Sequence, residues 1–477
     1  MKKKRKRKLK LWVKIVLFII ILILELIVSP FLFNYKSKTN PKIMNKKQKE
    51  NLTETIYNKI EDENITKEFI EWISDNYGEK NLSKLDDLLN DNEYDTKIWH
   101  EITGNSYIVL QDLYTKKYDN MNNVKIIKTK ETSTLSFIGD VSLADNWYIM
   151  PKYDERNKGI YGILSEDVVK IMTESDLMIA NNEFTVSDRG EKMPGKYYTF
   201  RASPKRLKIY QDLGVDLVTL ANNHVYDFGK IAFYDMIDSF NEYKIPYIGA
   251  GKNIEEAKKP YYFIVNGYKI SFVNATRAEK IILTPEATED EGGVFRCYDP
   301  TNFINVIKQE KEVSDYVIAL IHYGKEDSHE LEDVQVESSK QYIDAGADVI
   351  VGTHAHVLQG IEFYKDKPII YGLGNLCFDS FTPSYTQKWT EGYMAELTFN
   401  DGRISLDTVP YIQCAESPKV ILREDYETFR KQITDLNNII SNPELLNKEF
   451  MKMAEEENRM YFLEPSRNRY IGWLKRH

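Results

Sequence analysis

The chain has 477 residues, of which 42% are apolar and 12% aromatic, so it can bury a large core and is not globally disordered. Its net charge is −9, although residues 2–10 carry eight positive charges and no negative charge. Because the body is acidic, we exclude nucleic acid as a partner. Three cysteines without a C-x-x-C spacing exclude a disulfide scaffold and are expected to be small buried residues, Cys297, Cys377 and Cys414.

An apolar run at residues 11–33 follows the basic tip and is long enough to cross a hydrocarbon core of about 30 Å. No small-x-small cleavage site follows the run, so we expect an uncleaved single-pass anchor rather than a cleaved signal peptide. Glu25 within it costs roughly 2.5 kcal/mol or more at the membrane centre. The basic tip predicts a cytoplasmic N-terminus in the cell membrane and an extracellular main domain, although lysines between 36 and 49 reduce the asymmetry.

Residues 36–130 are polar and charged. Residues 67–75 and 82–89 carry apolar side chains at three- and four-residue spacing, which predicts amphipathic helices, and residues 64–66 and 81–83 are candidate helix caps. We interpret 36–130 as a helical spacer or small helical domain, with a specific binding module as the alternative.

The pattern changes near residue 131, where short β-rich runs begin to alternate with helical patterns. Strands are expected at 135–138, 177–180, 216–220, 247–249, 270–274, 316–321, 348–351 and 368–371, and helices at 164–173, 204–213, 230–243 and 332–345. This alternation predicts an α/β fold whose sheet is covered by helices on both faces. Segments 392–399 and 403–409 are expected to form a β-hairpin, and residues 416–477 a charged helical extension.

Polar residues that can bind metals follow the ends of successive predicted strands. In open α/β sheets this edge binds ligands. The candidates are Asp140, Asn182, Glu183, Asn223, His224, His322, Glu326, His354 and His356. Each of these side chains could instead serve as a turn or helix cap. Together they form a set of oxygen and nitrogen ligands suited to Zn²⁺, Mn²⁺ or Fe, in a site with one or two metal ions.

Six motifs in this region also occur together in a known family. They are GDVSL, IANNE, LANNHVYDFG, HYG-x-E, GADVIVGTHAHVLQGIE and IIYGLGN. In this order, across residues 134–411, they resemble the CapA family of poly-γ-glutamate capsule synthesis proteins. The resemblance implies a relation to calcineurin-like metallophosphoesterases, a four-layer α/β/β/α sandwich at residues 131–415, and a membrane anchor at residues 1–35.

The resemblance also implies roles for individual residues. Metal ligands would be Asp140, Glu183, Asn223, His322, His354 and His356, and His224 would be the general acid. Two departures weaken one metal position. Ser142 stands where a typical phosphoesterase has the His of Asp-x-His, and the segment 181–183 replaces its bridging Asp.

We consider three functions. The family role is to assist synthesis or export of an anionic γ-linked glutamate polymer at the cell surface, through contact with the polymer or its membrane complex. The alternatives are a metal-dependent hydrolase of phosphate esters or of an envelope polymer, and a non-catalytic scaffold. Arg277, Arg201, Asn182 and Glu326 are candidate substrate-binding residues.

Overall fold

The computed structural model describes most of the chain between residues 44 and 440. The described ranges are 44–60, 62–127, 132–145, 147, 149–279, 282–378, 387–400, 403–414 and 419–440. The expected anchor at 11–33 and the part of the C-terminal extension beyond residue 440 lie outside them. Among the described residues, none of the helices combines the length and apolar character needed to span a membrane. The chain divides into two compact units, Met1–Ile98 and Trp99–His477.

The described residues of the first unit form the helices α2 (Lys46–Tyr57), α3 (Lys67–Tyr77) and α4 (Glu79–Asp91). The helices expected at 67–75 and 82–89 are therefore confirmed. Thr66 caps α3 by accepting a hydrogen bond from the backbone N–H of Phe69 at 3.2 Å. The cap expected at 81–83 is wrong, because α4 already begins at Glu79, directly after Gly78.

A short helical segment leads into the second unit. It contains α5 (Lys97–Thr103), which includes the boundary between the units, and then α6 (Tyr107–Tyr114) and a 3₁₀ turn, η1 (Lys117–Asn120). Ser106 caps the start of α6 and donates a hydrogen bond to Asp315 at 2.6 Å. The segment after Trp99 is thus hydrogen-bonded to the rest of the larger unit.

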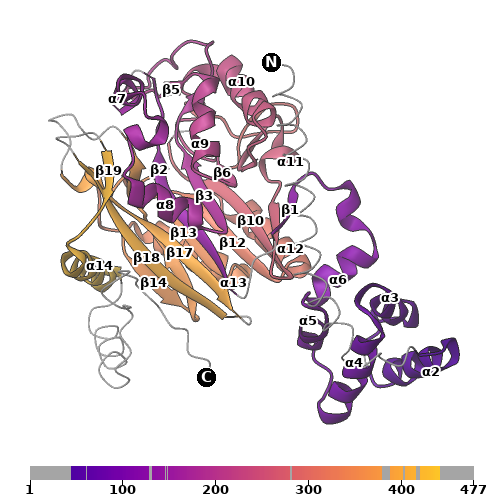
Figure 1. Ribbon diagram of the computed structural model, residues 1–477. Coiled ribbons are helices and arrows are strands. Elements are labelled where there is room, and N and C mark those ends of the chain that lie inside the picture. Colours follow the sequence, from indigo (N-terminus) through magenta and orange to yellow (C-terminus); the bar gives the residue numbers. More distant parts are fainter. Residues whose placement is uncertain are drawn as a thin grey trace, which may run out of the picture. The chain divides into compact units, whose positions relative to one another are not determined.

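Two large sheets form the second unit (Figure 1). The seven-stranded sheet has, in spatial order, β1 (Val124–Ile127), β9 (Tyr261–Val265), β10 (Tyr268–Thr276), β12 (Tyr316–His322), β13 (Val349–Thr353), β15 (Lys367–Ile370) and β14 (Ile361–Tyr364). The eight-stranded sheet has β19 (Lys419–Leu422), β18 (Arg403–Cys414), β17 (Glu391–Asn400), β2 (Ser133–Val141), β3 (Leu177–Asn182), β6 (Leu217–Thr219) and β7 (Tyr247–Ile248), with β16 (Asn375–Cys377) paired to β2. Neighbours β2, β3, β6 and β7 are parallel, as are β10, β12, β13 and β15. Their carboxyl ends therefore meet at common edges.

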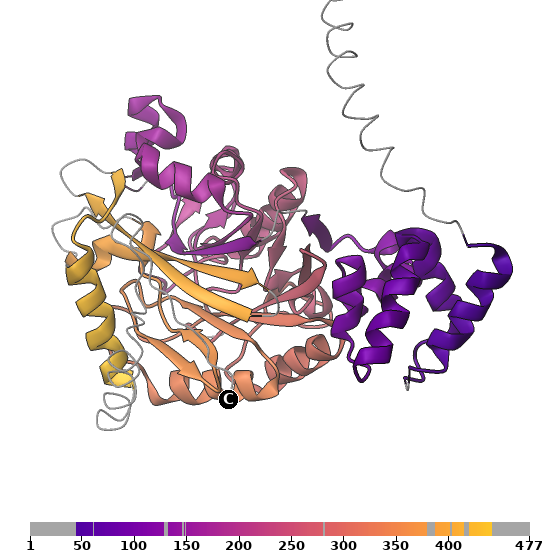
Figure 2. The ribbon, with the colours of Figure 1, turned by 60° about the horizontal axis from the view of Figure 1, so that its bottom comes forward.

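Three hydrophobic clusters organise this unit. One contains residues of both sheets, such as Phe137 and Ile179 from one and Phe272 and Ile318 from the other, so the sheets face each other across it. A second cluster joins the eight-stranded sheet to α8 (Glu166–Glu174), α9 (Lys208–Asp212) and α10 (Gly229–Glu242). A third joins the seven-stranded sheet to α12 (Thr301–Val313) and α13 (Asp333–Ala345). Figure 2 shows the magenta helices above the strands and the salmon helices below them, so an α/β fold is confirmed.

The expected elements agree well with the observed ones. Each of the eight expected strands overlaps a strand, and β17 and β18 form the expected antiparallel hairpin. The sequence reasoning missed α12 and the pairing of β9 with β10 through the turn Asn266-Gly267. Cys297 and Cys377 are buried, as expected.

Candidate metal centre

The predicted site residues come from the ends of strands in both sheets. Asp140 lies in β2 and pairs in register with Asn181 of β3, which Glu183 follows. From the other sheet, His322 ends β12 opposite Thr353, the last residue of β13. The remaining candidates follow β6 and β13 in the chain, namely Asn223, His224, His354 and His356. The prediction that these separate loops lie at a common edge is consistent with this geometry.

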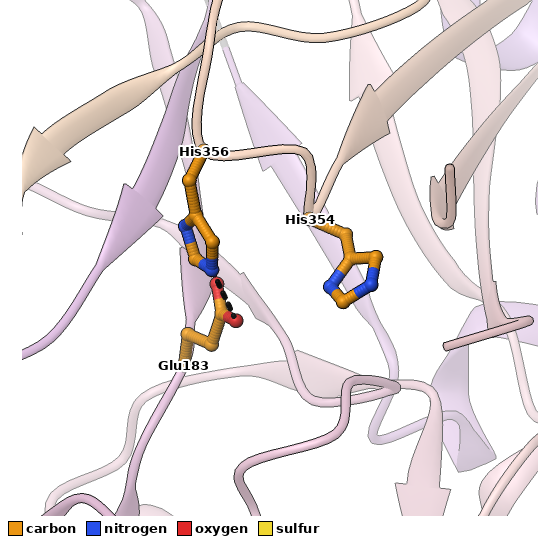
Figure 3. Close-up of side chains that lie close together, drawn as sticks. All are labelled: Glu183, His354 and His356. Atoms are coloured by element: carbon orange, nitrogen blue, oxygen red, sulfur yellow. Dashed lines mark ion pairs between the residues drawn. The ribbon is translucent and has the colours of Figure 1, made fainter. Parts of the chain in front are cut away.

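Glu183 lies at the centre of the group. Its side chain is 0% exposed, and its Oε1 atom lies 3.4 Å from His356 Nε2, 3.5 Å from His322 Nε2 and 4.0 Å from His224 Nε2. Figure 3 shows Glu183 reaching His356 from a different segment, with His354 beside it on the loop that carries both imidazoles. One carboxylate thus contacts side chains from separate segments of the chain.

Asp140 is the second buried carboxylate. Asn181 donates a hydrogen bond to its Oδ1 at 2.7 Å, and the backbone N–H of His354 donates to its Oδ2 at 3.1 Å. His356 Nδ1 lies 3.3 Å from the same Oδ2 atom. The amide of Asn181 also reaches Glu183 Oε2 at 3.3 Å, so it bridges the two acids.

Strained backbone positions the two histidines after β13. His354 has φ = 94° and His356 has φ = 57°, values in the left-handed region that side chains other than glycine rarely adopt. His356 is further fixed by Asn375, whose Oδ1 lies 2.9 Å from its Nδ1, and by stacking on Trp389 at 4.5 Å. Such strain is retained where the surrounding structure holds the residue, which is common at functional sites.

Burial decides the protonation of the acids and imidazoles. Burial, together with the charge of Asp140, raises the pKa of Glu183 well above its usual value. Burial opposes ionisation of Asp140 too, but its hydrogen bond with His356 leaves the pKa of Asp140 below its usual value. Burial lowers the pKa of His322 far below its usual value and that of His354 to about 4. Both imidazoles are therefore neutral at neutral pH and have a lone pair for a metal.

Two buried atoms of this group have no hydrogen-bond partner among the described residues. They are Oε1 of Glu183 and Nδ1 of His354. A buried carboxylate oxygen without a partner is costly, and a bound cation would compensate it. Two sets of ligand atoms lie close enough together to hold an ion, Glu183 with His354 and His356, and Asp140 with Glu183 and His322. The residues therefore fit a divalent metal, with Glu183 common to both sets.

Asn223 and His224 face this group from the loop after β6. His322 Nε2 lies 2.7 Å from Asn223 Oδ1. His224 Nδ1 lies 2.8 Å from Asp227 Oδ2, and its ring packs on Phe200 with 4.4 Å between centroids. With Nδ1 held by Asp227, the other nitrogen of His224 is directed toward Glu183. That nitrogen can carry a proton to or from a group bound at the centre.

The four candidate substrate-binding residues differ in their surroundings. Glu326 is half exposed, with Oε1 3.9 Å from His354 Nε2. Arg277 lies beside His322, whose carbonyl accepts its backbone N–H at 2.9 Å. Asn182 is fully buried and bonded to Phe184 and Tyr210, and its contact with a ligand stays a prediction. Arg201 donates to the carbonyls of Arg189 and Gly190, which is a structural role within its own loop.

The sequence reasoning missed several residues around the centre. Asp227 follows His224 by three residues, a spacing that could have indicated the pair. Lys196 is buried against Asp227 at 2.6 Å, although it comes from a charged loop without any sequence signal. Ser142, at the position where a ligand is missing, has a buried hydroxyl without a hydrogen-bond partner among the described residues.

Comparison with known proteins agrees with the resemblance seen in the motifs. The family model described as "Bacterial capsule synthesis protein PGA_cap" matches residues 134–380. The PGA biosynthesis protein CapA of Bacillus subtilis is 31% identical over 271 residues, which cover 55% of this chain and 67% of the relative. The capsule biosynthesis protein CapA of Bacillus anthracis is 28% identical over 307 residues, covering 62% and 71%.

A comparison with solved structures gives a weaker likeness. The crystal structure of TT1561 of Thermus thermophilus is 10% identical and covers 56% of this chain and 100% of its own, with a TM-score of 0.29. A value this low does not establish a common fold.

Proposed function

The chain belongs to the family of bacterial capsule synthesis proteins, and from this premise we propose that it assists synthesis or export of a poly-γ-glutamate-type polymer at the cell surface. The names of the two CapA relatives support this role. The apolar run at 11–33 behind a basic tip supports a single-pass anchor with the larger unit outside the cell. In that position the larger unit can meet the polymer, or the membrane complex that makes it, as the polymer emerges.

The observation that carries the proposal is the convergence of Asp140, Glu183, His322, His354 and His356 in one buried group. We propose that this group holds one or two divalent ions, Mn²⁺, Zn²⁺ or Fe²⁺, since imidazole and carboxylate suit these metals. Two facing sheets with helices on their outer sides support a four-layer sandwich of metallophosphoesterase type.

Each residue has a definite task in this centre. A bound metal would supply Lewis acidity for a phosphate, carboxylate or water. Glu183 and Asp140 would bind it as anions, and His322 and His354 as neutral imidazoles, consistent with their lowered pKa values. His224, held by Asp227, would move a proton at its Nε2 atom.

The pairing of His224 with Asp227 favours a second candidate, a metal-dependent hydrolase of phosphate esters or of an envelope polymer. A non-catalytic scaffold would need neither the pair nor the metal. Turnover of a chromogenic phosphodiester by the metal-loaded full chain, lost in His224→Ala, would support the hydrolase.

The metal centre is tested by measuring bound Mn²⁺ or Zn²⁺ in the purified full chain. We expect Glu183→Gln to lose the metal, because it removes the one carboxylate that both ligand sets share. Glu310→Gln is the matched control, since Glu310 is also buried but bonds Ser271 instead. Equal metal content in the two variants would contradict the centre.

The role in the capsule is tested in cells that lack this gene. Wild-type protein should restore the polymer, and the double variant His354→Ala/His356→Ala should not. Restoration by the double variant would separate the metal group from the capsule role.

A further inference from the structure

Two surface segments beside the metal centre are tied together by a buried lysine. Lys196, from the segment 193–200, has a side chain only 3% exposed. Its Nζ atom lies 2.6 Å from Asp227 Oδ1 and 2.8 Å from Glu279 Oε2, and it also donates to the backbone carbonyl of Asn223. Because Asp227 binds His224, this lysine connects both segments to the metal centre.

The second segment, residues 277–279 and 282–298, is hydrogen-bonded directly to candidate metal ligands. Thr284 donates its hydroxyl to the carbonyl of Asn223 at 2.9 Å, and the backbone N–H of Arg277 donates to the carbonyl of His322 at 2.9 Å. Arg296, which is 4% exposed, donates to the carbonyls of Thr284 at 2.7 Å and Ala278 at 3.0 Å. This segment therefore lies beside the centre.

The Arg277 side chain is held by contacts with Tyr298, and most of its guanidinium N–H groups remain available to donate hydrogen bonds to a ligand. Its carbon Cζ lies 4.8 Å from the centroid of the Tyr298 ring, and its Nη1 donates to the Tyr298 carbonyl at 2.8 Å. That bond uses one of five guanidinium donors, and among the described residues no carboxylate forms an ion pair with Arg277. The Cζ carbon of the buried Arg296 lies 4.9 Å from the centroid of the same Tyr298 ring.

Three tyrosines expose aromatic surface on these two segments. Tyr298 is 48% exposed, Tyr198 is 49% exposed and Tyr197 is 88% exposed. The hydroxyl of Tyr298 donates to the carbonyl of Glu279 at 2.9 Å, which fixes the ring. Tyr197 and Tyr198 contact each other edge to face at 4.8 Å. Exposed aromatic side chains gathered on neighbouring segments are typical of ligand-binding surfaces.

We propose that Arg277, Tyr298, Tyr197 and Tyr198 form a binding surface for an oligomer of γ-linked acidic units whose terminal anionic group binds the metal centre. This inference rests on the proposed metal centre and extends it to the ligand. Arg277 binds a second carboxylate of the same oligomer through its fork of N–H groups, and the tyrosine rings pack on the methylene groups between carboxylates.

Charge complementarity supports this occupant. The centre itself contributes the carboxylates of Asp140 and Glu183, with Glu326 half exposed beside them. A metal neutralises this local charge for one anionic group of the ligand, and a second anionic group requires a separate cation. Arg277 supplies that cation at the edge of the centre. A ligand with a single anionic group gains nothing from it.

The test measures binding of a γ-linked glutamate hexamer and of acetate, which has a single carboxylate, to the Mn²⁺-loaded full chain by calorimetry. We expect Arg277→Gln to weaken hexamer binding about tenfold or more, because a hydrogen-bonded charge pair is lost. Acetate binding and Mn²⁺ content should change less than about twofold. Lys258→Gln is the matched control, since it removes one positive charge from a lysine paired with Glu255 and should leave hexamer binding unchanged.

Two further variants separate the ring from the hydroxyl. Tyr298→Leu should weaken hexamer binding, whereas Tyr298→Phe, which keeps the ring beside Arg277, should bind within about threefold of wild type.

Several results would overturn the proposal. One is that Arg277→Gln binds the hexamer as tightly as wild type does. Another is that Lys258→Gln loses as much hexamer affinity as Arg277→Gln. The third is that the metal-loaded wild type does not bind the hexamer. In each of these cases Mn²⁺ still binds, so the metal centre stands. A wild type that binds no Mn²⁺ overturns both proposals together.

Discussion

Buried charged side chains lie beside both ends of strands β10 and β12, and the two ends differ in how those charges are compensated. At the start of the strands, Lys269 donates to Asp112 at 2.7 Å, and Asp315 accepts from Ser106 and from the backbone of Lys269. At the opposite end lies the metal group, where Glu183 Oε1 and His354 Nδ1 have no hydrogen-bond partner among the described residues.

The two ends differ in whether the protein itself compensates the buried charges. At the starting end Asp112 is ion-paired with Lys269, and Asp315 accepts two hydrogen bonds, so each buried carboxylate has a partner in the protein. The far end concentrates two carboxylates within one buried group and leaves a ligand atom unused, which lowers stability unless a cation binds.

The largest effect is expected from Lys269→Met at the starting end. Lys269 is fully buried, so its removal leaves Asp112 without the partner that compensates its burial. Breaking a buried pair in this way costs about 3–5 kcal/mol. Urea unfolding of the variant measures the loss, with Lys258→Met, at a half-buried lysine paired with Glu255, as the control. A loss below about 1 kcal/mol would show that Asp112 is compensated by Lys117, which lies 3.2 Å away.

Metal addition should have the next largest effect, and only at the far end. A ligand at one hundred times its Kd stabilises the folded protein by about 2.7 kcal/mol. We therefore expect Mn²⁺ to raise the melting temperature and EDTA to reverse the rise. Lys269→Met should show the same increment as wild type, since it does not touch the centre. The absence of any shift in the wild type would contradict a metal centre.

Glu183→Gln should stabilise the metal-free protein by about 1–2 kcal/mol, because it removes an uncompensated buried charge. Burial raises the folded-state pKa of Glu183 above the unfolded value, so the folded protein binds this proton more tightly. The stability contributed by this group is then present at low pH and lost as the pH rises from about 4.5 through the raised folded-state pKa. Unfolding curves between pH 5 and 8 should show the variant's advantage growing with pH. A variant less stable than wild type across this range would show that Glu183 is compensated without metal.

The smallest effect is expected from Ser106→Ala at the starting end. The Ser106 hydroxyl accepts from the backbone N–H of Val109 as the cap of α6 and donates to Asp315. Loss of a cap costs about 1 kcal/mol, and Ser106→Thr should retain most of the stability. Thermal unfolding of the Ser106→Ala and Ser106→Thr variants measures the loss of stability. Equal stability of the Ala and Thr variants would show that the cap contributes nothing.

Much of the fold could be read from local patterns. Strand and helix periodicity located β2, β3, β10, β12 and β13, because these segments are apolar runs between turn residues. The turn Asn266-Gly267 between β9 and β10 was equally readable, since both residues have positive φ, at 48° and 76°. The helix α12 was missed although its buried residues Phe303, Val306 and Ile307 follow helical spacing.

The candidate centre was only partly readable. Histidines and carboxylates after strand ends pointed to an edge of the sheet, and that edge does bring Asp140, Glu183, His322 and His356 together. Lys196 could not be predicted, because a lysine in a charged loop has no periodicity to indicate burial. Likewise, nothing in the sequence distinguished Arg277, whose guanidinium keeps free donors, from Arg201, which is bonded to carbonyls of its own loop.

By itself the sequence determined which segments form strands and which ligand types end them, because periodicity and residue chemistry are local properties. Only the tertiary structure decided which of these side chains are compensated. Burial and pairing depend on segments that lie far apart in the chain, such as Asp112 with Lys269 and Glu183 with His356. The free energy of a buried charge depends on those neighbours, and no single segment contains them.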